Sequence, residues 1–104
     1  MRKIENIAIS KSIGTAYVAH CRFKLGISSS KQTAKIIREF LGNVPDDLKN
    51  RRIRATPAKV RMTDVELSDM EAMQLSSIAH NTGIPQRSVI VSLLYEYAIK
   101  NNLV

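Results

Sequence analysis

The chain has 104 residues, an apolar fraction of 44% and a formal net charge of +7 at pH 7, which suits one compact domain with a modest core. It contains no apolar run of membrane-spanning length and no signal-peptide core, so we expect an intracellular, cytoplasmic protein. The single cysteine, Cys21, excludes an internal disulfide, and we predict that it is a small buried helix residue.

The positive charge is concentrated in the first part of the chain. Residues 1–61 contain 14 Lys and Arg against four Asp and Glu, a net charge of +10. Residues 62–104 contain two Lys and Arg against five Asp and Glu, a net charge of −3. A basic surface of this kind attracts polyanions such as nucleic acid. The alternative is a solvated basic surface that serves solubility.

We predict a β-strand over residues 2–9, whose end, Ile7-Ala8-Ile9-Ser10, is similar to Val65-Glu66-Leu67-Ser68 later in the chain. Strand alternation places Ile7 and Ile9 on one face, and on the other Ile4, Asn6 and Ala8. A helix is predicted over residues 11–25. The side chains that we expect in its core or beside it are Val18, Cys21, Tyr17 and Leu25.

A turn at Gly26-Ile27 and three serines, residues 28–30, precede a second helix that is predicted to end near Leu41. One of these serines can cap the helix. A helix N-terminus that carries hydroxyls and Lys31 is also suited to binding a phosphate. Ordinary capping without a ligand is the alternative.

The segment that follows predicts a basic linker over residues 44–58, between an N-terminal unit of residues 1–43 and a C-terminal unit of residues 59–104. Its cations are Lys49, Arg51, Arg52 and Arg54. They indicate either an arm that lies along phosphates or a solvated connector.

The C-terminal unit predicts a strand that ends at Leu67 and two further helices. Ser68 and Glu71 have the spacing of a capping box for a helix that begins at Asp69, and Gly83 suits its left-handed end. Pro85 fits the first turn of the last helix. The apolar stripe of that helix consists of Val89, Ile90, Leu93, Leu94 and Ala98.

The two units have similar patterns when their Gly-Ile turns, Gly26-Ile27 and Gly83-Ile84, are superimposed. Ile36-Ile37 then coincides with Leu93-Leu94, and the strand ends match after a gap of one residue. This pattern of a strand and two helices, present twice, resembles the ribbon-helix-helix family of DNA-binding proteins. The doubling is similar to the transcription regulators of archaeal filamentous viruses that carry two such motifs.

The resemblance implies a mainly α fold with one short antiparallel β-ribbon, in which one chain supplies both halves of a pseudo-dimer. The ribbon of such proteins lies in the DNA major groove. The residues that we expect to face bases are Ile4, Asn6, Ala8, Arg61 and Thr63. Asn6 is the strongest of these candidates, because a side-chain amide can bind adenine through two hydrogen bonds.

The resemblance also implies that helix N-termini and basic residues hold the DNA backbone. The residues that we expect at phosphates are Arg2, Lys3, Ser28, Ser29, Ser30, Lys31, Arg51, Arg52, Arg54, Lys59, Gln86, Arg87 and Ser88. For Arg2 and Lys3, a frayed basic terminus is the alternative.

The second strand departs from this pattern, because simple alternation gives its groove-facing residues as Met62, Asp64 and Glu66. Two carboxylates facing a polyanion are unfavourable. Either a β-bulge shifts the face to present Lys59, Arg61 and Thr63, or the ribbon of the second unit lies away from the groove.

The leading hypothesis is therefore a sequence-specific regulator of transcription that binds double-stranded DNA and self-associates, as a dimer or as several copies along DNA. The alternatives are a protein-interaction module of the antitoxin or relaxosome-accessory kind and a DNA-coating protein that is indifferent to sequence. The sequence has no catalytic motif and no metal-ligand spacing, so we expect no enzyme activity, cofactor, metal, small-molecule ligand or membrane partner.

Overall fold

The computed structural model describes residues 2–45 and 59–103, except for the side chains of residues 5–6 and 59–63. The described chain is mainly helical and contains one two-stranded antiparallel sheet, as the sequence predicted. The elements in chain order are β1 (Arg2–Ser10), α1 (Lys11–Ala19), η1 (His20–Leu25), α2 (Ser29–Leu41), β2 (Lys59–Leu67), α3 (Asp69–Thr82) and α4 (Gln86–Lys100). Each strand is thus followed directly by helical segments.

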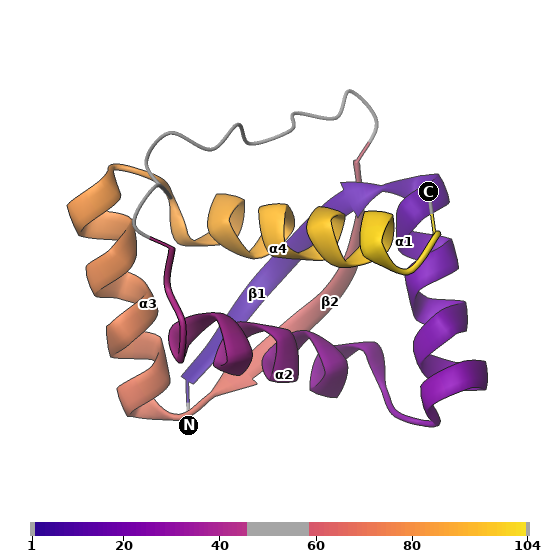
Figure 1. The fold of residues 1–104 in the computed structure, drawn as a ribbon, viewed down its shortest axis with the longest axis horizontal. Coiled ribbons are helices and arrows are strands. Elements are labelled where there is room, and N and C mark those ends of the chain that lie inside the picture. Colours follow the sequence, from indigo (N-terminus) through magenta and orange to yellow (C-terminus); the bar gives the residue numbers. More distant parts are fainter. Residues whose placement is uncertain (1, 46–58, 104) are drawn as a thin grey trace.

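The sheet is a ribbon formed within one chain. β1 and β2 pair antiparallel, from Arg2 opposite Leu67 at one end to Ser10 opposite Lys59 at the other. Figure 1 shows α2 and α4 crossing the same face of this ribbon, with α1 and α3 at opposite ends of the molecule. The helices therefore form a layer on one side of the two strands.

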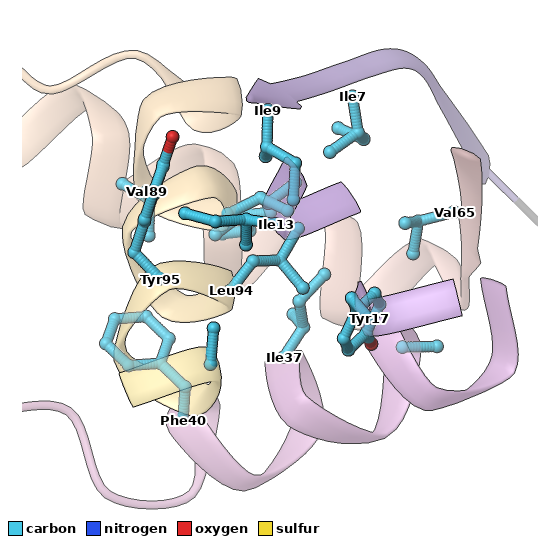
Figure 2. Packing of buried hydrophobic residues seen from close by; sticks show 14 of the residues in the cluster. Ile7, Ile9, Ile13, Tyr17, Ile37, Phe40, Val65, Val89, Leu94 and Tyr95 are labelled. Atoms are coloured by element: carbon cyan, nitrogen blue, oxygen red, sulfur yellow. The ribbon is translucent and has the colours of Figure 1, made fainter. Parts of the chain in front are cut away.

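The core lies between the ribbon and this helical layer. Ile7 and Ile9 of β1 are buried as predicted, and Val65 and Leu67 of β2 are buried beside them. Figure 2 shows that side chains from the strands and from α1, α2 and α4 point into one common interior. Burying one such aliphatic side chain contributes about 1.5–3 kcal/mol to folding, so the packed face of the ribbon holds it against the helices.

Two irregularities interrupt the pairing of the strands. Residues 5–6 of β1 stand opposite the single residue Asp64, between the pairs Ile4–Val65 and Ile7–Thr63. In β2, Met62 is the extra residue between the partners of Ile7 and Ala8. Each strand therefore contains one β-bulge, which resets the alternation of its side chains.

The bulge in β1 changes the face on which Ile4 lies. Ile4 is partly buried, packs against the core cluster and stands opposite the fully buried Val65. The expectation that Ile4 shares a face with Ala8 is therefore wrong. Simple alternation through residues 2–9 does not account for the extra residue at positions 5–6.

The first helix also contains an extra residue. α1 continues as a π-helical segment, η1, in which the Gly26 N–H donates to the Cys21 carbonyl five residues earlier. α1 and η1 have nine and six residues, whereas α3 has 14. A π-turn accommodates one residue more than an α-turn, which accounts for the one-residue gap between the two units.

This π-turn decides which side chains of the first helix are buried. Tyr17 is only 1% exposed, whereas Val18 is 38% exposed. The prediction that Val18 is buried is wrong. It depends on aligning the two units at Gly26 and Gly83, and the extra residue of the π-turn makes Tyr17, not Val18, the equivalent of the buried Leu75. Cys21 is fully buried, as predicted.

Local capping signals are confirmed. The Glu71 N–H donates to Ser68 Oγ at 3.1 Å and the Ser68 N–H donates to Glu71 Oε1 at 2.9 Å, which completes the predicted capping box. Gly26 and Gly83 end their helices with φ angles of 68° and 73°, a conformation that glycine adopts without steric cost. Pro85 is the N-cap of α4 rather than its first residue.

Candidate nucleic-acid interface

The face of the ribbon that points away from the core forms the centre of the candidate site. Lys3 and Glu66 are opposite each other on the two strands and both are exposed. Ala8 is partly exposed between the buried Ile7 and Ile9, so it lies on the outer face as predicted. This face therefore carries charged and small residues, unlike the apolar face beneath the helices.

The pairing of β2 with β1 shows which residues of β2 stand opposite the outer face of β1. Arg61 stands opposite Ala8 and Lys59 opposite Ser10, whereas Thr63 stands opposite the buried Ile7. The bulge considered as an alternative from the sequence is therefore present. It brings Arg61 and Lys59 into register with residues of the outer face, but it pairs Thr63 with a residue of the core face.

The base-facing candidate Asn6 lies in the bulged part of β1, and its side chain is outside the described structure, as are the side chains of Lys59, Arg61 and Thr63. The linker candidates Arg51, Arg52 and Arg54 lie outside the described residues altogether.

The two carboxylates of β2 have basic neighbours. Lys3 Nζ lies 3.7 Å from Asp64 Oδ2, and the side chain of Asp64 is only 18% exposed. Glu66 pairs with the same Lys3 in the strand register. The ion pair is long and the lysine is half-exposed, so it contributes little to stability. It does reduce the negative charge that the outer face would present to a polyanion.

The N-terminus of α2 lies beside β2. Ser28 caps the helix, since its Oγ accepts a hydrogen bond from the Lys31 N–H at 3.2 Å. The Ser30 hydroxyl donates to the Asp64 carbonyl of β2 at 2.6 Å. A hydroxyl has one proton to donate, so Ser30 ties the helix to the ribbon and does not donate to phosphate in this arrangement. Lys31 is exposed.

An open hollow of about 560 Å³ adjoins this helix N-terminus. It is lined by Val18, Arg22, Gly26, Ile27, Ser28, Ser29 and Lys31. The hollow thus brings Arg22 of η1 close to the predicted phosphate-binding residues. Sequence reasoning missed Arg22, although its position one turn before the Gly26 cap placed it near the same end of the helix.

The N-terminus of α4 lies beside β1. Pro85 provides no side-chain hydrogen bond to cap the helix. An open hollow of about 570 Å³ here is lined by Lys3, Ile4, Pro85, Gln86 and Arg87. Three predicted phosphate-binding residues, Lys3, Gln86 and Arg87, are therefore brought together, whereas Ser88 is partly buried one residue further along the helix.

The α2 N-terminus lies beside β2 and the α4 N-terminus lies beside β1 (Figure 1), and one hollow adjoins each of these helix ends. The first N–H groups of a helix have no acceptor within the helix and lie at the positive end of its dipole. Both ends are therefore suited to an anion. Arg2 is also exposed at the end of β1, with its Nε 3.9 Å from Asp69 Oδ1.

Two hydrogen bonds between side chains join helices of the layer. The Tyr17 hydroxyl is 3.0 Å from Thr33 Oγ1, and His20 Nε2 is 2.8 Å from the Tyr97 hydroxyl. Burial raises the pKa of Tyr17 and the pKa of the Cys21 thiol above their ordinary values. Both groups are therefore protonated at neutral pH. The Tyr17–Thr33 hydrogen bond joins α1 to α2, and the His20–Tyr97 hydrogen bond joins η1 to α4.

We compared the chain with known proteins and structures. This chain has no match among protein-family models, curated proteins or solved structures. Within residues 2–45 and 59–103, no cluster of His, Cys, Asp and Glu could hold a metal ion. None of the described helices is both long enough and apolar enough to cross a membrane.

Proposed function

We propose that the chain is a sequence-specific regulator of transcription that binds double-stranded DNA, built from two ribbon-helix-helix repeats that act as a pseudo-dimer. One observation carries the proposal: an antiparallel ribbon has helices on one face only, and a helix N-terminus stands on each side of it. A two-stranded ribbon is narrow enough to enter the major groove. The helix N-termini would then meet phosphates on the two sides of that groove.

Equivalent burial in the two halves supports a repeat. Ile7 and Val65 each lie three residues before the serine that joins the strand to the helix, and Ile9 and Leu67 lie one residue before it. All four are buried. After the π-turn, the difference in residue number between equivalent positions of the two halves becomes smaller by one. Fully buried pairs continue with that difference, namely Thr33 with Ile90 and Ile37 with Leu94.

We assign base reading to Asn6, Ala8 and Arg61. Ala8 lies on the outer face, and Arg61 is its direct partner in the ribbon. An arginine can bind guanine through two hydrogen bonds, an asparagine can bind adenine in the same way, and a small apolar residue can contact a thymine methyl group. These three residues come from different positions in the two strands, so the recognised site need not be a palindrome.

We assign phosphate binding to Lys31 and Arg22 at the α2 N-terminus and to Lys3 and Arg87 at the α4 N-terminus. Each pair lines one of the two open hollows. Such contacts set the position and the affinity of a protein on the duplex but do not carry sequence information.

Selection of duplexes from a random library by the purified protein, at a fixed salt concentration of about 0.15 M, tests the proposal, since non-specific affinity depends steeply on salt. We expect an enriched motif whose two halves differ. Tight binding without enrichment would instead indicate a DNA-coating protein, and no retained DNA would favour a protein-interaction module. The Asn6→Ala variant should lose discrimination between the enriched motif and random duplex, with Lys100→Ala as the matched surface control.

A further inference from the structure

Two exposed apolar sites lie at opposite ends of the molecule. Phe23 of η1 is 82% exposed, and Met70 and Met73 of α3 are 72% and 68% exposed. η1 continues α1 at one end of the longest dimension, which measures 35 Å, and α3 lies at the other end (Figure 1). These side chains do not contribute to the core, and their exposure to water is unfavourable unless another surface covers them.

The two sites carry opposite charge. Phe23 stands between Arg22 and Lys24, which are both exposed, and residues 11–25 include no Asp or Glu. Met70 directly follows the exposed Asp69, and residues 69–82 include no Lys or Arg. A cation close to Asp69 is contributed by β1, where Arg2 Nε lies 3.9 Å from Asp69 Oδ1 in a long, exposed ion pair. We call Phe23 and Lys24 the η1 face, and Asp69, Met70 and Met73 the α3 face. An aromatic site flanked by cations thus has a methionine site with a carboxylate as its counterpart.

The Met70 and Met73 side chains point away from the body of the molecule. Residues 70, 73 and 77 lie on one stripe of α3 at helical spacing, and all three are exposed, whereas Leu75 on the opposite side of the helix is fully buried. The α3 face is therefore open to a second molecule at the end of the long axis.

We propose that the η1 face of one copy of this chain binds the α3 face of a second copy, head to tail. The contact joins two different surfaces, so each copy in a pair keeps one face open. Further copies then add in a row rather than closing a symmetric dimer. This association goes beyond the proposed function and does not rest on it, because it belongs to the protein without DNA.

Sedimentation of the full chain without DNA tests the contact. We expect the average mass of the wild-type protein to rise steadily with concentration, with no limit at two copies. Phe23→Gln, or Met70→Gln combined with Met73→Gln, should weaken association at least about tenfold, because each removes apolar area from the contact. Ile99→Gln is the matched control, since Ile99 is 49% exposed but belongs to neither face. A wild-type protein that stays monomeric throughout would overturn the proposal.

Mixing the two variants gives the sharpest test. The Phe23→Gln variant keeps its α3 face and the double methionine variant keeps its η1 face, so an equal mixture should form pairs and nothing larger. A variant that dimerises alone would show a symmetric contact and contradict the head-to-tail arrangement. Far-UV circular dichroism checks that each variant is folded. Independently of any variant, added salt should weaken wild-type association by screening the opposite charges; association that is indifferent to salt would contradict the charge pairing.

Discussion

α2 and α4 lie on the same face of the ribbon, yet their N-termini are built differently. α2 is capped by the Ser28 side chain and tied to β2 by the Ser30 hydroxyl. α4 begins after Pro85, which offers no side-chain cap, and opens into a hollow beside Lys3. One end has a backbone donor satisfied by its own serine, whereas the other has no side-chain cap. Two ends that flank one ribbon can therefore hold phosphates with different groups.

The largest expected effect concerns the core that the two helices share. Ile37→Ala in α2 and Leu94→Ala in α4 should each lower the free energy of unfolding by about 2–5 kcal/mol, because both side chains are fully buried. Urea unfolding followed by circular dichroism measures the loss. We expect one transition in every case, with Ile99→Ala close to wild type. Separate transitions for the two halves would mean that the helices do not share a core.

Salt dependence of DNA binding separates the two N-termini. Lys31→Ala removes a cation beside α2, and Arg87→Ala removes one beside α4. Each should reduce the slope of log affinity against log salt by about 0.9 for one lost phosphate contact. Lys100→Ala, at the far end of α4, should leave the slope unchanged. An unchanged slope in either test variant would show that the cation at that helix end does not contact phosphate.

The Ser28 side chain, which caps α2, should contribute to the stability of the fold, whereas the neighbouring Ser29 side chain should contribute little. Ser28→Ala removes the acceptor for the Lys31 N–H and should cost about 1 kcal/mol of stability. Ser29→Ala, at the first residue of the helix, should stay within about 0.5 kcal/mol of wild type. Thermal unfolding of the two variants measures the difference. Equal losses would show that the side-chain cap does not set the stability of this end.

The smallest effect concerns the capping box of α3. The Ser68 N–H, and after it the Arg38 side chain 2.7 Å away, lower the pKa of Glu71. A carboxyl whose pKa is lower in the folded state stabilises the fold above its unfolded pKa, and this stabilisation is lost as the pH falls through the folded value. Wild type should therefore lose more stability than Glu71→Gln below about pH 4.3, the ordinary value for glutamate. Parallel pH profiles of the two proteins would contradict this role.

Features fixed by neighbouring residues could be predicted from the sequence. The capping box at Ser68, the left-handed end at Gly83 and the buried residues Ile7 and Ile9 depend on local spacing, and all are as predicted. They need no knowledge of distant parts of the chain.

Features that depend on tertiary contacts could not be predicted in the same way. The bulges arise from pairing between strands far apart in the sequence, so simple alternation places Ile4 on the wrong face. The burial of Tyr17 instead of Val18 follows from a π-turn, for which the sequence offered only an unexplained gap. The sequence does not show that the Ser30 hydroxyl is already used, because its acceptor, the Asp64 carbonyl, lies in β2.

The pairing of β1 with β2 inside one chain also determines how the fold responds to dilution. A ribbon made by two separate chains falls apart as protein concentration drops, since its stability includes the association of the chains. Here the partner strand is covalently attached, so the strands remain paired at any concentration. A single molecule carries the complete ribbon, and refolding after denaturation should follow first-order kinetics with a rate that does not change when the protein is diluted.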